Sequence, residues 1–462
     1  MARSGGTARR QWFGSGGSQC WCCGGARDAM TRPWLSVVGI ALEGWDGLSA
    51  PARAALRNAE LIIGGARHLG MVEIPDGAAT YGWETPLSKT VARIRAAQGR
   101  SVVVLATGDP MHFGIGVTLA RHFSPAEMTV WPQVSAFSLA AARLGWGLAE
   151  CHLITAHGRP VARVRRYLQD GARLVILSED RSTPLAVAEL LVAAGCGASR
   201  MTVLAEMRQS GGESLRLELS AAEAVTALPQ QAIPDLHCLA VECRRSSGRN
   251  LSVAAGLDDD EFDSPTPQQL LTKQPIRAMV LALLAPQAGD CLWDIGAGSG
   301  SVGIEFLRLL LTSSGGGHGL LAARAYAIER NLDRLPTIAA NAERLGVPEL
   351  KIVGGDAEPI IDTLPDPTVI FVGGGIRIPN LVNRLWQRLP PGGRMVATAV
   401  TLTGEARLGQ CQEEFGGDLY RVAVNRSESI GNQAKIWRPY LPVTLWRASK
   451  SNASELSSFL NP

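Results

Sequence analysis

A glycine-rich stretch in the second half of the chain has the residue types and spacing of a nucleotide-binding loop. An apolar run ends at Asp294. The loop that follows contains Gly296, Ala297, Gly298, Ser299 and Gly300. Glycine lets a backbone approach a ligand closely and adopt positive φ angles, and the free N–H groups of the next helix face the bound group. The stretch therefore predicts a strand, a tight loop and a helix start around a cofactor.

Three cofactors compete for this loop: a nucleoside triphosphate, NAD and S-adenosyl-L-methionine. No Gly-Lys-Ser/Thr follows, which excludes a P-loop. The glycines are spaced Gly-x-Gly-x-Gly rather than Gly-x-Gly-x-x-Gly, and Asp294 precedes them, which favours S-adenosyl-L-methionine over a dinucleotide. Ser299 is not a hydrolase nucleophile, because Ala297 stands where that motif needs glycine. A glycine-rich turn without a ligand remains the alternative.

Three further strands are expected to bring side chains to the same ligand, because the carboxyl ends of parallel strands meet at one edge of a sheet. Glu329 ends the second strand, where a carboxylate can accept both ribose hydroxyls of an adenosyl group. Asp356 and Ala357 follow the third strand, beside the expected adenine. Gly373 follows the fourth strand, beside the reacting methyl group.

A helix is predicted to begin near Thr272, some twenty residues before the loop. Thr272 is its expected N-cap, and Pro275 is tolerated in the first turn. Arg277 is either an anchor for a substrate carboxylate or an exposed helix residue. Before this helix, the acidic run 258–263 is interpreted as a solvated connector.

The first half also alternates strands and helices from Trp34 onward. The apolar strand that starts at Val102 delivers Gly108, Asp109 and Pro110 to its carboxyl end, where ligands collect in an open α/β layer. Four arginines follow in one short stretch: Arg159, Arg163, Arg165 and Arg166. They either bind carboxylates of a ligand through bidentate contacts or form a solvated helix face.

Composition limits the class of protein. A chain of 462 residues predicts two domains. The net charge of +3 is too small to indicate nucleic acid or membrane binding, and no apolar stretch is long enough to span a membrane. We therefore expect a soluble cytoplasmic protein without a nucleic acid or membrane partner.

Most of the nine cysteines are scattered singly, which suits a reducing compartment. Cys20, Cys22 and Cys23 lack further ligands at metal spacing, so no metal site is predicted. Residues 1–33 are expected to be a disordered extension or the product of a start codon assigned too early, with Met30 as the working initiator.

Several motifs in the first half resemble the tetrapyrrole (corrin/porphyrin) methylases, most closely the precorrin methylase that acts at carbon 5. They are Val104 to Gly116 with its Thr-Gly-Asp-Pro, Val134 to Arg143, Ala156 to Arg159, and Ser178 to Pro184. The resemblance implies two α/β subdomains with S-adenosyl-L-methionine between them and Gly108, Asp109 and Pro110 in the cofactor cleft. Ala41 departs from the family's first Gly-Ile-Gly loop.

The second half resembles the precorrin methylase that acts at carbon 15 and removes the acetate carboxyl at carbon 12, which has a Rossmann-like class I methyltransferase fold. The resemblance rests on Thr272 to Arg277, Asp294 to Gly300, Glu329, Asp356-Ala357, and Gly373 to Gly375. Pro275 stands where that family usually has glutamate.

Together the halves predict an α/β protein with a tetrapyrrole methylase domain at 34–245, a linker at 246–268, a class I methyltransferase domain at 269–448 and a tail at 449–462. Their order resembles the bifunctional, decarboxylating precorrin methyltransferases of cobalamin biosynthesis. This implies methylation of precorrin-6B at carbons 5 and 15 with loss of the ring-C acetate carboxyl, giving precorrin-8X from two S-adenosyl-L-methionine molecules.

The alternatives are methylation of another tetrapyrrole or, with less support, of RNA, and a dinucleotide-dependent oxidoreductase. We expect a homo-oligomer, because both families commonly self-associate. No catalytic acid or base is assigned.

Overall fold

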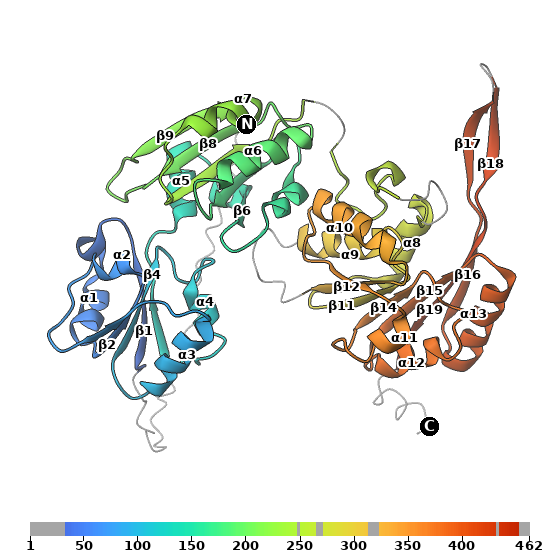
Figure 1. Ribbon diagram of the computed structural model, residues 1–462, viewed down its shortest axis with the longest axis horizontal. Coiled ribbons are helices and arrows are strands. Elements are labelled where there is room, and N and C mark those ends of the chain that lie inside the picture. The colour runs from blue at the N-terminus through green and yellow to red at the C-terminus, as the bar shows by residue number, and fades with distance from the viewer. Residues whose placement is uncertain (1–32, 247–249, 265–270, 313–322, 431–433, 452–462) are drawn as a thin grey trace, which may run out of the picture.

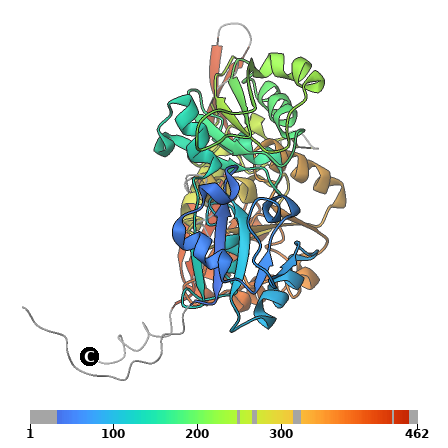
Figure 2. The ribbon, with the colours of Figure 1, turned by 90° about the vertical axis from the view of Figure 1, so that its left-hand side faces the viewer.

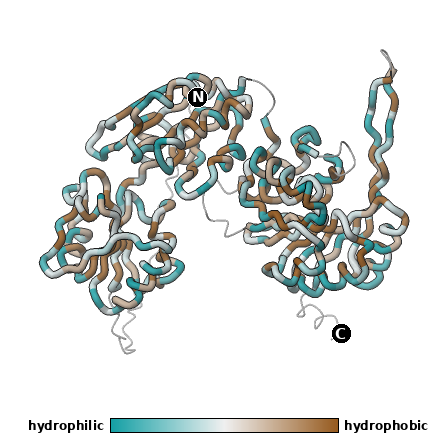
Figure 3. Tube along the Cα trace, in the orientation of Figure 1, coloured by the Kyte–Doolittle hydropathy of each residue, from teal (hydrophilic) through white to brown (hydrophobic). Residues whose placement is uncertain are grey.

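The computed structural model describes residues 33–246, 250–264, 271–312, 323–430 and 434–451. Three β-sheets follow one another along the chain, each covered by helices (Figure 1). Apolar residues concentrate along the strands of these sheets (Figure 3), as expected when each sheet is buried between layers. Cys20, Cys22, Cys23, Met30 and the glycine-rich insertion at 313–319 lie outside the described residues.

The first sheet has five parallel strands in the order β3-β2-β4-β1-β5. The strands are β1 (Leu35–Ile40), β2 (Leu61–Ile63), β3 (Ala79–Tyr81), β4 (Val102–Thr107) and β5 (Met128–Trp131). The helices are η1 (Gly44–Gly47), α1 (Ala50–Arg57), α2 (Ala66–Leu69), α3 (Leu87–Ala96) and α4 (Ile115–Leu119). Val37 packs into the cluster that contains Ile94 of α3, while Val38 packs with Leu56 of α1. Helices therefore cover both faces of this sheet (Figure 2).

The second sheet has the order β6-β7-β10-β8-β9 and is mixed, since β10 runs antiparallel to both of its neighbours. The strands are β6 (Cys151–Thr155), β7 (Arg173–Leu177), β8 (Arg200–Ala205), β9 (Leu215–Ser220) and β10 (His237–Glu242). The helices are α5 (Ala136–Leu144), η2 (Leu148–Glu150), η3 (Val161–Tyr167), α6 (Thr183–Ala193), α7 (Ala221–Ala227) and η4 (Leu228–Gln230).

The third sheet has seven strands in the order β13-β12-β11-β14-β15-β19-β16. The strands are β11 (Cys291–Ile295), β12 (Arg324–Glu329), β13 (Lys351–Gly354), β14 (Val369–Val372), β15 (Arg394–Ala399), β16 (Asp418–Val422) and β19 (Val443–Ser449). The helices are η5 (Asp259–Glu261), α8 (Gln274–Leu284), α9 (Ser301–Thr312), η6 (Leu332–Arg334), α10 (Leu335–Arg344), α11 (Ala357–Ile360), α12 (Leu381–Arg388) and α13 (Leu402–Phe415). The strand order reverses between β11 and β14, which is where open α/β sheets bind ligands.

A separate two-stranded ribbon, β17 (Asn425–Ile430) and β18 (Ala434–Pro439), projects away from the third sheet (Figure 1). Its residues are almost all exposed, including Trp437. No sequence pattern predicted this ribbon.

An ion-pair cluster joins the two halves of the chain. Glu349 accepts hydrogen bonds from Arg163 Nε at 2.5 Å and from Arg166 Nη2 at 2.7 Å and 2.9 Å. The side chain of Arg166 is 4% exposed and that of Glu349 is 24% exposed, so this pairing is partly shielded from water. The expectation that these two arginines bind a ligand or form a solvated face is therefore wrong, because both contact Glu349 of the other half.

The acidic run 258–263 is also not a purely solvated connector. Leu257 and Phe262 are buried against the third sheet's core. Asp259 accepts a hydrogen bond from Gln274 at the start of α8 and forms an ion pair with Arg277. The connector therefore folds back onto α8.

Among the described residues, no helix is long and apolar enough to cross a membrane. In the same part of the chain, no group of three histidine, cysteine or acidic residues could hold a metal ion.

Candidate active site

A pocket of about 1100 Å³ lies at the carboxyl ends of β11 to β14 in the second half. Sequence analysis proposed seven of the residues that line it: Thr272, Gly296, Gly298, Glu329, Asp356, Ala357 and Gly373. These residues come from the loop before α8 and from the ends of four parallel strands. The structure thus brings together in one pocket side chains that lie up to 101 positions apart in the chain.

The glycine loop requires glycine at two positions for identifiable reasons. Gly296 has a φ of 73°, and a Cβ there would lie 2.8 Å from the backbone nitrogen and Cα of Gly374. Gly300 has a φ of 78°, and its Cβ would lie 2.7 Å from a methyl carbon of Ile338. Both positions therefore combine a left-handed backbone with close packing, and the loops after β11 and β14 touch backbone to backbone.

Four other predicted residues do not line the pocket: Asp294 near the end of β11, and Ala297, Ser299 and Gly300 of the loop itself. Ser299 is 1% exposed, and its carbonyl accepts a hydrogen bond from Asn341 Nδ2. Asp294 is likewise 1% exposed, and its Oδ2 accepts from the backbone nitrogen of Gly303 at 3.0 Å. These contacts tie the loop to α9 and α10.

Burial, and to a smaller extent the charge of Glu329, raises the pKa of Asp294 to about 7 against the hydrogen bond from Gly303, which lowers it. An unfolded aspartate has a pKa of about 3.9, so the folded protein binds more protons than the unfolded chain between these values. Asp294 therefore destabilises the fold as pH rises from about 4 through 7.

We expect Asp294→Asn to be more stable than the wild type at pH 8, by as much as about 4 kcal/mol, because the amide keeps an acceptor for Gly303 without a charge. The difference should vanish near pH 4. Urea unfolding of both proteins across this range measures it, and a difference independent of pH would contradict a raised pKa.

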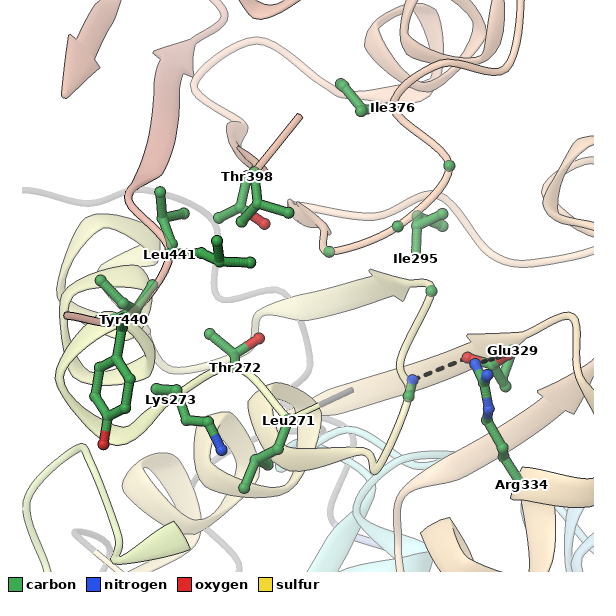
Figure 4. Close-up of a pocket in the computed structure, with 18 of the residues that line it drawn as sticks. Leu271, Thr272, Lys273, Ile295, Glu329, Arg334, Ile376, Thr398, Tyr440 and Leu441 are labelled. Carbon is green, nitrogen blue, oxygen red and sulfur yellow. Dashed lines mark hydrogen bonds and ion pairs between the residues drawn. The ribbon is translucent and has the colours of Figure 1, made fainter. Parts of the chain in front are cut away.

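Glu329 is held in one orientation at the edge of the pocket. Its Oε2 accepts from the backbone nitrogen of Gly298 at 2.9 Å, while its Oε1 accepts from Asn331 N at 2.9 Å and from Arg334 Nη1 at 3.1 Å. The carboxylate is thus bound directly to the glycine loop, beside Arg334 (Figure 4). It is 4% exposed and stands where an adenosyl ribose was expected.

Two expectations about the segment before the loop are wrong. Helix α8 begins at Gln274 with Lys273 as its N-cap, so Thr272 does not cap it. Arg277 is fully buried and is neither exposed nor in the pocket wall. It donates to Glu305 at 2.5 Å and to the carbonyl of Thr272, and therefore fixes the loop that carries Thr272.

Another part of the pocket wall comes from residues that no sequence pattern predicted. They are contributed by the loop after β14, by the end of β15 and by the base of the β17–β18 ribbon, and include Arg377, Thr398, Arg426, Arg438, Tyr440 and Leu441. Tyr440 and Leu441 lie beside Thr272 and Lys273 in Figure 4. No sequence motif marks the ribbon, so its place in the pocket wall could not be predicted from the sequence.

In the first half, the predicted turn lies at the carboxyl end of β4. Gly108 has a φ of 56°, and its carbonyl accepts a hydrogen bond from the backbone nitrogen of Gln133. A Cβ on Gly39 would lie 2.0 Å from the carbonyl oxygen of Gly108, so the backbone of β1 approaches the turn after β4 closely at Gly39. Asp109 Oδ1 accepts from the backbone nitrogen of Met111, and Pro110 is buried. The half-buried Ala41 accepts from Gly44 N through its carbonyl.

Comparison with protein families assigns both halves. Residues 35–207 match the model of the tetrapyrrole (corrin/porphyrin) methylases, and residues 265–450 match the precorrin methyltransferase domain. The two matches together assign the chain to the two-part tetrapyrrole methyltransferases.

Individual relatives narrow this class. The chain is 40% identical over 423 residues to precorrin-6Y C(5,15)-methyltransferase [decarboxylating] of a Sinorhizobium species, a match that covers 91% of this chain and 98% of the relative. It is 37% identical over 417 residues to the Mycobacterium tuberculosis protein of the same name, covering 90% of this chain and all of the relative. The chain belongs to the family of decarboxylating precorrin-6Y C(5,15)-methyltransferases.

One solved structure is also similar to part of this chain. It is the C-terminal domain of precorrin-6Y C5,15-methyltransferase from Rhodobacter capsulatus. The match has 36% sequence identity and a TM-score of 0.38, and it covers 43% of this chain and 100% of the solved domain.

Proposed function

We propose that this protein methylates precorrin-6B at carbons 5 and 15 and removes the carboxyl group of the ring-C acetate, giving precorrin-8X in cobalamin biosynthesis. Family membership over nearly the whole chain supports the reaction. The observation that carries it structurally is the pocket where the glycine loop, Glu329, Asp356 and Gly373 converge. We assign methylation at carbon 15 and the decarboxylation to the domain at 269–448, and methylation at carbon 5 to the domain at 34–245.

The residues of the pocket fit S-adenosyl-L-methionine. Gly296 lets the glycine loop approach the loop after β14, because a Cβ there would lie 2.8 Å from the backbone of Gly374, and the carboxylate of Glu329 stands at the end of the neighbouring strand. Asp356 and Ala357 follow at the next strand end, where adenine is expected. The bound cofactor supplies an electrophilic methyl group on its sulfonium sulfur. The chain has to hold a nucleophilic ring carbon in line with that methyl group and exclude water.

The remaining wall suits a large, acidic and partly apolar substrate. Ile376, Leu271 and Leu441 provide apolar surface. Arg377 and Arg426 provide positive charge where carboxylates can be bound, while Lys273 and Arg438 line the same pocket in ion pairs with Asp259 and Glu428. Electrons released when the acetate carboxyl leaves as carbon dioxide pass into the conjugated ring, so the substrate itself carries much of this step.

Incubation with labelled S-adenosyl-L-methionine and precorrin-6B, followed by mass spectrometry of the pigment, tests the proposal. Two added methyl groups and one lost carboxyl group are expected. An unmodified pigment would refute it. Calorimetric titration with S-adenosylhomocysteine and with NAD separates the ligand classes, and binding of NAD alone would favour an oxidoreductase instead.

Glu329→Gln is expected to weaken S-adenosylhomocysteine binding at the second half by about 10-fold to 100-fold, the usual cost of losing a hydrogen bond to a charged group. The amide has one acceptor atom, whereas Gly298, Asn331 and Arg334 together present donors to both oxygens. Calorimetry measures the change. Glu413→Gln, which alters an exposed carboxylate on α13, is the matched control and should bind as the wild type does. If the two variants bind S-adenosylhomocysteine with equal affinity, Glu329 is not part of the cofactor site.

A further inference from the structure

The carboxyl edge of the first sheet carries an arginine whose charge has no ion-pair partner in the described part of the chain. Arg67 lies in α2, directly after β2, and its Nη2 donates to Thr107 Oγ1 at 3.2 Å and contacts His68 Nε2 at 3.1 Å. Among the described residues, no carboxylate forms an ion pair with Arg67. Thr107 is the last residue of β4 and immediately precedes Gly108. Arg67 therefore lies next to the turn that the first half is expected to use for its cofactor.

The imidazole of His68 is neutral and helps to orient the guanidinium of Arg67. Burial, followed by the adjacent charge of Arg67, lowers the pKa of His68 to about 4, so the imidazole is uncharged at neutral pH. Thr107 Oγ1 lies 3.0 Å from the same Nε2. Because Nε2 accepts from Arg67, the ring proton lies on Nδ1, which is buried without a partner among the described residues. Both contacts of Arg67 are thus to neutral groups, which orient the guanidinium without forming an ion pair with it.

The two subdomains of the first half face each other at Arg67. Burial lowers the pKa of the Arg67 guanidinium, and the charge of Glu206, which follows β8 of the second sheet, opposes that shift. Glu206 itself has a φ of 49°, an uncommon backbone conformation for a residue other than glycine. The negative charge of Glu206 therefore acts on Arg67, although the two side chains form no ion pair.

Exposed apolar side chains gather at the same edge. Trp83 follows β3, Met111 follows β4 and Val134 follows β5, and the three are between 37% and 44% exposed. All strands of this sheet are parallel, so these positions share one edge. Trp83 Nε1 and His68 Nδ1 both lie 3.8 Å from a Cβ built on Gly65, which places Trp83 beside the Arg67 cluster. An apolar rim next to this cation fits a ligand that is flat, conjugated and carboxylated.

We propose that Arg67, oriented by His68 and Thr107, binds a side-chain carboxylate of the macrocycle at the site of the first half, with Trp83, Met111 and Val134 against the ring. This assignment rests on the proposed function. Arg67 binds the substrate next to Gly108. This contact fixes the orientation of the macrocycle and so places the reacting carbon at the site.

The bifunctional chain provides its own internal control for the test. Arg67→Ala, incubated with precorrin-6B and S-adenosyl-L-methionine, should give a product that carries one methyl group and has lost one carboxyl group, because the second half is unchanged. At the first half, KM for the macrocycle should rise by about 10-fold to 100-fold, as expected when a charge-assisted hydrogen bond is lost, while the affinity for S-adenosylhomocysteine stays the same. Arg67→Lys should recover part of the affinity, since it keeps the charge without the fork geometry.

Arg57→Ala is the matched control, because Arg57 lies at the far end of α1 over the ring of Trp45. It should add both methyl groups. If Arg67→Ala also adds both with an unchanged KM, or if it loses carbon 5 methylation together with cofactor binding, the proposal is overturned. If the wild type itself adds no methyl group, the proposed function fails instead, which keeps the two failures distinct.

Discussion

Gly296→Ala is expected to abolish methylation at carbon 15 while leaving methylation at carbon 5 intact. The alanine would hold a left-handed φ of 73°, which costs about 1–2 kcal/mol for a residue with a Cβ. Its Cβ would also lie 2.8 Å from the backbone of Gly374, so the loops after β11 and β14 must move apart. Both loops line the pocket, and a displacement of about 1 Å there is enough to lower the rate about 100-fold.

The measurement combines calorimetry with mass spectrometry of the pigment. Affinity for S-adenosylhomocysteine at the second half should fall by at least about 100-fold, and the product should carry one methyl group and retain the ring-C carboxyl. Gly409→Ala in α13 is the control, since a Cβ there meets nothing within 4 Å. It should keep both activities and gain about 0.5–1 kcal/mol of stability. A Gly296→Ala protein with wild-type affinity would show that the loop does not hold the cofactor.

The parts of the fold that could be predicted from sequence are those whose strands are buried on both faces. Continuous apolar runs such as the one from Val102 predict a parallel strand, and glycine after the run predicts the turn to a helix. The ribbon of β17 and β18 could not be predicted in this way, because its residues are nearly all exposed and polar residues occupy both faces. Its contribution to the pocket through Arg426 and Tyr440 depends on a position in space that no local pattern encodes.

Long-range contacts account for the incorrect predictions at the site. Glu349 is 186 positions from Arg163, so the partner of that arginine was not visible in its own stretch. Arg277 occupies the first turns of a helix, where either exposure or ligand binding is reasonable from sequence. Its burial follows from the connector at Leu257, which folds over α8 and supplies a carbonyl to Arg277 Nη2. Glycine spacing, in contrast, is a local requirement, and the loop that it predicted lines the pocket.

Removal of the Arg277 side chain is expected to destabilise the second half by about 3–5 kcal/mol, the usual cost of leaving a buried charge unpaired. Arg277 and Glu305 have side chains that are 0% and 2% exposed, and Arg277 also lies 4.7 Å from the centroid of the Phe262 ring. In Arg277→Met, Glu305 retains hydrogen bonds from the backbone nitrogens of Gly256 and Leu257 but loses the opposite charge. Urea unfolding measures the loss, and Arg216→Ala, which breaks an exposed pair with Glu218, should cost at most about 1 kcal/mol.

A double variant separates the unpaired charge from lost packing. Glu305→Gln keeps an acceptor for Gly256 but carries no charge, so adding it to Arg277→Met should recover much of the stability. If the double variant is as unstable as Arg277→Met alone, the loss comes from packing against Phe262 and from the carbonyls of Thr272 and Leu257. Because Thr272 lines the pocket, Arg277→Met should also weaken cofactor binding under conditions where the domain remains folded. The ion pair thus supports the site from within the core, although it touches no ligand.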